Sequence, residues 1–407
     1  MTVYLDYTNT GRIRGEIHIP GSKSLSNRWL ILSRLFPGCI DMKGLSPSDD
    51  TKILDRALES DTGEKHLGMS GTAMRFLIAY FSAKPGANVV LRGEENLLNR
   101  PIGSLVNTLR KMGAQIDYLE KEGFPPVRIT GNAFPGGKYE IDGSTSSQFV
   151  SALLLISPLF AGGLQLRIKN HIVSEPYIDM TVSVLKQAGI WVSKEGSYIS
   201  VRPVGKIKAL SLTIEPDWSA LSYYYSLAAL HSGVKLYFPG FEKESLQGDS
   251  VLPVLFEPLG VHTAYTGDGI RLTHEKKALP GHMQYDLNAY PDLAQSLAVA
   301  CTGLGIKTGI VGLTTLKIKE TDRLNALKKE LQKTGAGVRI TEHSIHISPP
   351  EKIRGNLRIK TYGDHRMAMA FAPLSVKIPL WIENAEVVSK SYPGFWEDWE
   401  KLLQEGE

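Results

Sequence analysis

The sequence has little cysteine and no long uninterrupted apolar run. Its two cysteines, Cys39 and Cys301, have neither CxxC nor Cys/His spacing. We therefore expect no zinc site, no disulfide framework and a reducing compartment, the cytoplasm. The most apolar stretch, residues 152–166, is broken by Pro158, and residues 1–10 contain no apolar run. Neither a membrane span nor a signal peptide is expected.

The chain also lacks a strong charge imbalance. Forty-six Lys and Arg residues against 42 Asp and Glu give a net charge of +4, which argues against nucleic-acid binding. Any anion site must therefore be local. The chain has 407 residues, 42% of them hydrophobic and 22% charged. That length and composition predict a globular protein of two or three domains.

A helical apolar pattern ending in glycine, followed by a strand-like pattern, occurs four times at an interval of about 75 residues. Glycine can take the left-handed conformation that ends a helix. The alternation after it, as in Ile116 with Val127 and Ile129, is typical of paired strands. Any α/β protein repeats helix, glycine and strand, but the regular interval favours a true internal repeat. The glycines are Gly113, Gly189, Gly260 and Gly335.

Several predicted helices begin with hydroxyls, glycine or cations. Residues 20–24 (PGSKS) precede a helix that carries Arg28 about one turn on, and residues 71–75 (GTAMR) and 142–148 (DGSTSSQ) precede two more. Free backbone N–H groups at a helix start favour an anion. Ordinary Ser capping is the alternative for each segment alone. The GxxxxGK spacing of a Walker loop is absent.

Further helix starts fall at residues 174–177 (SEPY) and 290–292 (YPD), and two charged segments occupy residues 317–323 (KIKETDR) and 361–369 (TYGDHRMAM). We expect Glu320 and Arg323 to share one helical face. Charge runs usually cover solvated surfaces. Together, however, these helix starts carry many cations and few acids, which predicts a local cleft for a polyanion.

The motifs, in this order along essentially the whole chain, resemble the 5-enolpyruvylshikimate-3-phosphate (EPSP) synthase family. The segments that carry the resemblance are residues 21–28, 71–75, 100–103, 142–149, 319–323, 364–369 and 390–393.

The resemblance implies an α/β (α+β) fold, a two-domain inside-out α/β barrel. Each domain would hold three βαβαββ-like units with pseudo-threefold symmetry, the N-terminal domain being shortened. The C-terminal domain would span residues 1–18 and 217–407, the N-terminal domain residues 19–216, and the active site would lie in the cleft between them.

The resemblance further implies transfer of the enolpyruvyl group of phosphoenolpyruvate to shikimate 3-phosphate, by a monomer with no cofactor or metal. The residues that would hold shikimate 3-phosphate are Lys23, Ser24, Arg28, Ser146, Ser147, Gln148, Ser174, Tyr177, Asp292, Thr315 and Lys319. Those that would hold phosphoenolpyruvate are Lys23, Gly71, Arg100, Gln148, Arg323, His365, Arg366 and Lys390.

The reaction needs groups that move protons. By resemblance, Asp292 would be the base at the 5-hydroxyl, Glu320 would handle the proton at C3 of phosphoenolpyruvate, and Lys23 would act as an acid and anion anchor. Asp50 would orient Lys23 or cap its helix.

The chain departs from the family pattern in three places. Met69 stands where an Asn is usual, so an amide contact near phosphoenolpyruvate is lost. Thr315 stands where Asn or Ser is frequent. The stretch from Asp50 to Gly71 is short, which predicts that one strand pair is missing.

Two alternatives remain. A sister enzyme acting on UDP-N-acetylglucosamine shares the fold, but its loop cysteine is absent from residues 94–100. A catalytically impaired paralogue that only binds a phosphorylated ligand would account for Met69, but it has no need of both Asp292 and Glu320.

Overall fold

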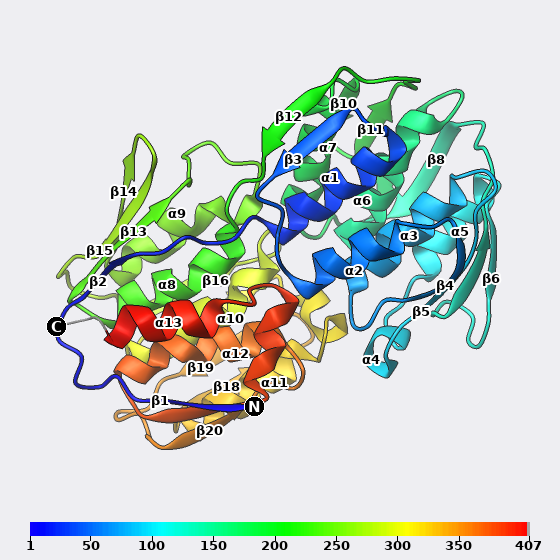
Figure 1. Ribbon diagram of the computed structural model, residues 1–407. Coiled ribbons are helices and arrows are strands. Elements are labelled where there is room, and N and C mark those ends of the chain that lie inside the picture. The colour runs from blue at the N-terminus through cyan, green and yellow to red at the C-terminus, as the bar shows by residue number, and fades with distance from the viewer. Residues whose placement is uncertain (405–407) are drawn as a thin grey trace. The chain divides into compact units, whose positions relative to one another are not determined.

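The computed structural model describes residues 1–404, and the chain divides into two compact units (Figure 1). Unit 1 consists of residues 1–20 and the chain from residue 215 onward, and unit 2 of residues 21–214. No helix among the described residues is long and apolar enough to cross a membrane.

Unit 2 contains two complete strand–helix–strand–helix–hairpin repeats. In each, the first two strands are parallel and the hairpin returns antiparallel, giving the sheet orders β4-β5-β7-β6 and β10-β11-β9-β8. The first repeat consists of β4 (Thr62–His66), α3 (Gly71–Ser82), β5 (Asn88–Arg92), α5 (Gly103–Lys111), β6 (Gln115–Tyr118) and β7 (Val127–Thr130), with the short α4 (Glu95–Leu98) before α5. The second consists of β8 (Gly137–Asp142), α6 (Ser147–Ile156), η1 (Ser157–Leu159), β9 (Leu164–Lys169), α7 (Glu175–Gln187), β10 (Val192–Glu195) and β11 (Tyr198–Val201).

The third sheet of unit 2 has only two strands, β12 (Leu210–Thr213) and β3 (Ile40–Lys43), which run parallel. Its helices are α1 (Lys23–Leu35) and α2 (Asp49–Ala57), and the chain passes from α2 directly to β4. The strand pair predicted to be missing between Asp50 and Gly71 is therefore absent from this sheet.

Unit 1 is built from the same repeat. One copy is complete, with the sheet order β16-β17-β19-β18; it consists of β16 (His282–Asp286), η4 (Pro291–Leu293), α10 (Ala294–Gly303), β17 (Lys307–Val311), η5 (Thr314–Ile318), α11 (Arg323–Lys333), β18 (Gly337–Ile340) and β19 (Ile345–Ser348). A second sheet takes its first strand from β2 and has the order β14-β15-β13-β2; its elements are β2 (Ile13–Glu16), α8 (Trp218–Leu230), β13 (Val234–Pro239), η2 (Gly248–Val251), α9 (Leu252–Phe256), η3 (Glu257–Leu259), β14 (Val261–Thr266) and β15 (Gly269–His274).

The third sheet of unit 1 has three strands, in the order β1-β21-β20. Here the N-terminal strand β1 pairs antiparallel with β21 in place of a hairpin strand. The elements are β1 (Thr2–Leu5), β20 (Leu357–Lys360), α12 (His365–Phe371), η6 (Ala372–Val376), β21 (Leu380–Glu383), η7 (Ala385–Lys390) and α13 (Phe395–Gln404).

The repeat predicted from the four glycines is confirmed. Gly113, Gly189, Gly260 and Gly335 all have positive φ, at 105°, 77°, 86° and 96°. Each ends a helical segment and precedes an antiparallel hairpin.

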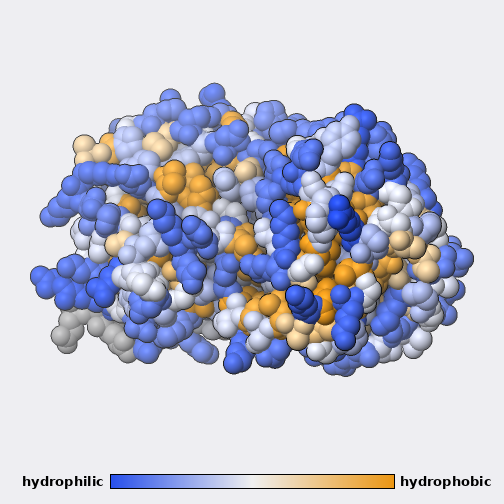
Figure 2. All heavy atoms as spheres, turned by 90° about the horizontal axis from the view of Figure 1, so that it is seen from above, coloured by the Kyte–Doolittle hydropathy of each residue, from blue (hydrophilic) through white to orange (hydrophobic). Residues whose placement is uncertain are grey.

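Each unit has three inner helices that pack on one another: α1, α3 and α6 in unit 2, and α8, α10 and α12 in unit 1. Helices that are apolar on all sides must be buried, and every residue of α12 and nearly every residue of α8 is buried. Several polar residues, such as Lys23 in α1 and Gln148 in α6, lie in the first turns of these helices. Links such as Gln148 to Thr72, from the starts of α6 and α3, place those starts at one end of the unit. On the face drawn in Figure 2 polar side chains predominate, and apolar side chains form patches between them.

Candidate functional site

In unit 1, Arg323 holds three carboxylates. Its Nε lies 2.6 Å from Asp364 Oδ2, its Nη1 2.9 Å from Asp292 Oδ1 and its Nη2 2.7 Å from Glu320 Oε2. Burial alone would lower the pKa of this guanidinium, but the three carboxylates raise the pKa above its ordinary value. The residues come from the chain around the starts of α10, α11 and α12, so the fold brings three separate motifs onto one side chain.

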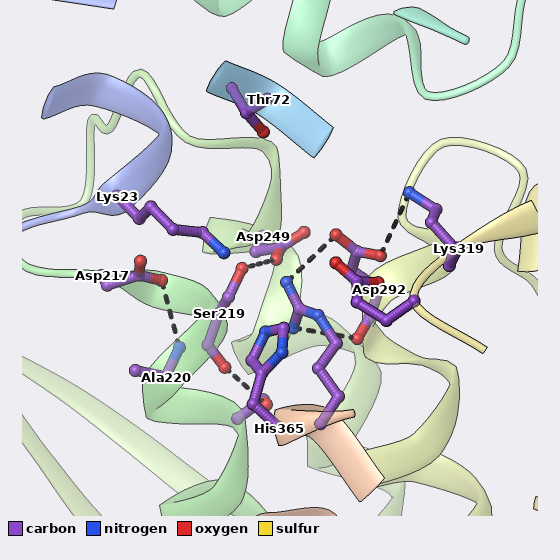
Figure 3. Close-up of polar contacts among 12 residues, drawn as sticks. Lys23, Thr72, Asp217, Ser219, Ala220, Asp249, Asp292, Lys319 and His365 are labelled. Atoms are coloured by element: carbon purple, nitrogen blue, oxygen red, sulfur yellow. Dashed lines mark hydrogen bonds and ion pairs between the residues drawn. The ribbon is translucent and has the colours of Figure 1, made fainter. Parts of the chain in front are cut away.

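Asp292 is also surrounded by other cations. Arg366 Nη2 lies 3.0 Å from its Oδ2, and Lys319 Nζ lies 3.5 Å from its Oδ1 (Figure 3). Burial would raise the pKa of this carboxyl, but Arg366, Lys319 and Arg323 hold the pKa well below its usual value. Asp292 is therefore ionised at neutral pH. It is a weak base as long as these cations remain in contact with its carboxylate.

Two further predicted residues join this cluster. Lys390 Nζ lies 3.9 Å from Glu320 Oε1, and His365 Nδ1 lies 3.6 Å from Asp364 Oδ1. Asp364 caps α12 by accepting the backbone N–H of Arg366 at 2.9 Å. It thus fixes the start of the helix that carries His365 and Arg366. We define the unit 1 cluster as eight residues: Asp292, Lys319, Glu320, Arg323, Asp364, His365, Arg366 and Lys390. Apart from His365, they carry four side-chain cations and three carboxylates.

A fourth carboxylate lies near the cluster. Asp249, in η2, is buried and accepts a hydrogen bond from Ser219 Oγ near the start of α8 (Figure 3). Its other oxygen, Oδ1, has no hydrogen-bond partner among the described residues. Burial raises the pKa of Asp249 to about 6, although the nearby charge of Arg366 lowers it.

In unit 2, Arg28 is a buried cation held only by neutral groups. Its Nε donates to Thr181 Oγ1 at 2.8 Å and its Nη2 to Ser151 Oγ at 3.2 Å, and backbone oxygens of Ser24 and Tyr177 accept the other bonds. Within the described chain no carboxylate pairs with it. Burial lowers the pKa of Arg28 to about 10. A buried cation without a counter-ion is costly unless a ligand supplies the negative charge.

Gln148 links the starts of α6 and α3. Its Oε1 accepts Arg75 Nη1 at 2.9 Å, and its Nε2 donates to Thr72 Oγ1 at 3.0 Å. Gly71 begins α3, and a Cβ built at this glycine would lie only 2.2 Å from Arg100 Nη1. Glycine is therefore needed for the guanidinium of Arg100 to lie against the helix start.

The other predicted residues of unit 2 also lie at helix starts. Lys23 is the first residue of α1, and its Nζ lies 3.2 Å from Asp50 Oδ2, so Asp50 orients Lys23 as expected. Ser146 caps α6 and Ser147 begins it. Ser174 precedes α7 with a φ of 53°, a conformation that costs free energy and is found most often at functional sites.

Some expectations need correction. Glu320 and Arg323 do pair, but not as neighbours on a helix, because α11 begins only at Arg323. Thr315 is buried in η5, and its expected contact with shikimate 3-phosphate stays a prediction. Asp364 was part of a recognised motif but was not predicted as a site residue. Asp249 was missed entirely, because a lone Asp in Gly-Asp-Ser gives no sequence signal.

Comparison with known proteins identifies the family. The family model described as EPSP synthase (3-phosphoshikimate 1-carboxyvinyltransferase) matches residues 54–399. The chain belongs to the EPSP synthase family. The fold is that of an enolpyruvyl transferase, as two solved structures also show.

The family includes relatives over almost the full length of the chain. A 3-phosphoshikimate 1-carboxyvinyltransferase of Bacteroides fragilis strain YCH46 is 42% identical over 396 residues, covering 96% of this chain and 95% of the relative. One from Actinobacillus pleuropneumoniae serotype 5b is 37% identical over 426 residues, covering 97% of each.

The solved structures share the fold at lower identity. EPSP synthase from Acinetobacter baumannii superposes with a TM-score of 0.77 at 22% identity, covering 100% of this chain and 98% of the other. The enolpyruvyl transferase NikO from Streptomyces tendae gives 0.75 at 15% identity, covering 98% and 97%.

Proposed function

We propose that this chain transfers the enolpyruvyl group of phosphoenolpyruvate to the 5-hydroxyl of shikimate 3-phosphate and releases phosphate. The product is 5-enolpyruvylshikimate 3-phosphate, on the route to aromatic amino acids, in the cytoplasm. The observation that carries the proposal is the pair of carboxylates, Asp292 and Glu320, held on the single guanidinium of Arg323. A protein that only binds anions has no need of two such groups among its cations.

Shikimate 3-phosphate needs an anion site rich in hydroxyls. Arg28 lacks a carboxylate partner among the described residues, so a bound anion would lower the cost of burying its charge. Ser146, Ser147, Ser174 and Lys319 would take the phosphate, since helix starts and hydroxyls suit a phosphate monoester. The remaining residues that would hold this substrate are Lys23, Ser24, Gln148, Tyr177, Asp292 and Thr315.

Phosphoenolpyruvate would bind to cations from both units, since its carboxylate and phosphate suit guanidinium forks. Arg323 is the exception in this proposal. Four of its five N–H groups already donate to carboxylates, so its main role is to position Asp292 and Glu320. The residues that would hold phosphoenolpyruvate directly are Lys23, Gly71, Arg100, Gln148, His365, Arg366 and Lys390.

The reaction proceeds by addition and elimination. In the addition step C3 of phosphoenolpyruvate gains a proton from Glu320, while the 5-hydroxyl attacks C2 and loses its proton to Asp292. In the elimination step C3 returns a proton to the carboxylate of Glu320, and the C2–O bond to phosphate breaks. The released phosphate takes up the proton that Asp292 removed from the 5-hydroxyl, so both carboxyl groups return to their starting states. Lys23 serves as an acid and anion anchor, and the surrounding cations stabilise the charge of the tetrahedral intermediate.

The low basicity of Asp292 implies that substrates activate it. Its pKa is depressed by Arg366, Lys319 and Arg323. Phosphate and carboxylate groups of the substrates compete for Arg366 and Lys319, and weaker contacts raise the pKa of Asp292 toward its usual range. The base is thereby strengthened only when its substrates are bound.

Residues of both units are proposed to hold the same pair of substrates. One chain supplies every residue named, and no metal or cofactor takes part in the proposed steps. Lysine and arginine provide the positive charge that the phosphorylated substrates require.

Phosphate release tests the proposal. The chain is incubated with phosphoenolpyruvate and either shikimate 3-phosphate or UDP-N-acetylglucosamine at millimolar concentration. We expect release only with shikimate 3-phosphate. Release with the nucleotide sugar would indicate the sister reaction, and binding of shikimate 3-phosphate without release would indicate a protein that only binds.

A further inference from the structure

The two-stranded sheet of unit 2 leaves one edge of β3 open. β12 pairs with the other edge of β3. The first bond on that edge joins Leu210 N–H to the carbonyl of Cys39, the residue just before β3, at 2.8 Å. Because successive residues of a strand in a parallel ladder bond to opposite sides, the backbone groups of Ile40 and Met42 point to the open edge. No strand of the described chain pairs with that edge. In Figure 1, β3 and β12 lie side by side on the outside of this unit.

A hollow of about 510 Å³ lies beside β3 and is open to solvent. Ile40 and Met42 line it from the strand, and side chains of α1 and α2 line it from the helices. In the two complete repeats of this unit a hairpin strand pairs at the corresponding edge. The apolar residues of the lining are Leu30, Ile40, Met42, Leu45, Leu58 and Tyr80.

The outward face of β3 is charged in a self-complementary way. Asp41 and Lys43 are exposed, whereas Ile40 and Met42 are half-buried. Asp41 accepts a hydrogen bond from Ser211 Oγ at 3.1 Å and keeps acceptor capacity. Lys43 has no ion pair within the described chain. If two β3 strands met antiparallel about Met42, each Asp41 would lie opposite a Lys43.

We propose that a second copy of this chain pairs with the open edge of β3, giving a weak homodimer. The two strands run antiparallel about a twofold axis at Met42, and their pairing extends two two-stranded sheets into one sheet of four strands. The N–H and C=O of Met42 bond to those of the other copy. An isologous contact of this kind needs a patch that complements itself, which the alternation of Asp41 and Lys43 supplies. The dimer departs from the monomer expected from the family resemblance.

The proposed contact is small. A strand edge of four residues, beside a hollow lined by both apolar and charged side chains, lies at the low end of interface sizes. We therefore expect dimers only at high protein concentration. The inference does not depend on the proposed enzymatic function.

Charge swapping tests the register. Sedimentation velocity over a concentration series of the full chain should show a monomer–dimer equilibrium. In the dimer, residue 41 of each copy lies opposite residue 43 of the other, so Asp41→Lys or Lys43→Asp creates two pairs of like charges. Each variant should raise the dimer dissociation constant about tenfold. The double variant Asp41→Lys/Lys43→Asp restores opposite charges and should return the constant to near the wild-type value.

Two more variants complete the test. Arg128→Glu reverses an exposed charge on β7, a central strand, and should leave the dissociation constant unchanged. Met42→Pro removes the N–H at the open edge and should abolish the dimer. A wild-type chain that stays monomeric at every concentration would overturn the proposal, as would a double variant no tighter than either single variant.

Discussion

At the scale of single residues, Arg323 and Arg28 are two buried cations with different kinds of partner. The unit 1 cluster pairs its cations with carboxylates inside the protein, as Arg323 does with Asp292, Glu320 and Asp364. Arg28 in unit 2 has only neutral partners. The first arrangement can position proton-transfer groups, and the second leaves a positive charge for a ligand to neutralise.

Replacing either carboxylate of the proposed pair should slow the reaction. Asp292→Asn and Glu320→Gln keep the shape of each side chain but remove its ability to exchange a proton. Each should lower kcat at least about a hundredfold, the usual size of a general acid–base contribution. Steady-state phosphate release measures this, and Glu244→Gln, at an exposed position, is the control. Near-normal turnover in either variant would remove that residue from the mechanism.

Asp249 should make the stability of the protein depend on pH. The folded carboxyl, with its pKa raised from 3.8 to about 6, keeps its proton over a range in which the unfolded one has lost it. The free energy of unfolding therefore falls as pH rises from about 4 to about 6, by about 3 kcal/mol. Asp249→Asn removes this contribution.

Urea unfolding of both proteins at pH 4 and pH 7 measures the effect. From pH 4 to pH 7, the free energy of unfolding of the variant should rise by about 3 kcal/mol relative to that of the wild type. Asp117→Asn, at an exposed position on β6, is the control and should show no such gain. Parallel pH dependence of wild type and Asp249→Asn would show that Asp249 titrates alike in the folded and unfolded chain.

Gly71 should control the binding of phosphoenolpyruvate. A methyl group at this position would lie 2.2 Å from Arg100 Nη1 and 2.5 Å from Arg75 Nη1, so both guanidinium groups must move. Gly71→Ala should raise the KM for phosphoenolpyruvate about tenfold or more. Calorimetry should find a smaller loss of affinity for shikimate 3-phosphate, which the change reaches only through the hydrogen bond of Arg75 to Gln148.

Gly103→Ala is the matched control for Gly71→Ala. Gly103 also begins a helix, but the nearest atom to its added Cβ lies at 3.5 Å. An equal rise in KM for both variants would show that the effect is not specific to the contact between Gly71 and Arg100.

At the scale of elements, the helix–glycine–hairpin repeat was predictable from the sequence because it rests on local signals. As predicted, helices α5 and α7 end just before Gly113 and Gly189, and an antiparallel strand pair follows each glycine. The missing strand pair was predictable as well, from the short stretch before Gly71. The sequence alone did not show that η5 ends before Glu320, because that break depends on the partners of the charged side chains.

The left-handed glycines should matter for stability at the level of the repeat. Gly189 has a φ of +77°, and no atom lies within 4 Å of an added Cβ. Gly189→Ala therefore makes no steric clash, and its only cost is the strain of placing alanine in the left-handed backbone conformation. The free energy of unfolding should fall by about 1–2 kcal/mol. Urea unfolding measures this, with Gly205→Ala as the control, since Gly205 has open space but no positive φ. Equal effects at the two sites would contradict the conformational argument.

At the scale of the whole molecule, both crossings of the chain connect a strand of one unit to an inner helix of the other. β2 of unit 1 is followed along the chain by α1 of unit 2, and β12 of unit 2 by α8 of unit 1. The motifs that carry the family resemblance therefore come from both units. Their partners within each unit, such as Thr181 for Arg28, could not be predicted, because residues 153 positions apart meet only in the folded chain.

The reaction itself tests the account most directly. A phosphorus NMR time course of the wild-type chain with equimolar phosphoenolpyruvate and shikimate 3-phosphate follows every phosphate in the mixture. We expect the phosphoenolpyruvate signal to be replaced by inorganic phosphate, one for one with a shift of the shikimate 3-phosphate signal to that of its enol ether. Unchanged spectra, with shikimate 3-phosphate bound but intact, would contradict the proposed function.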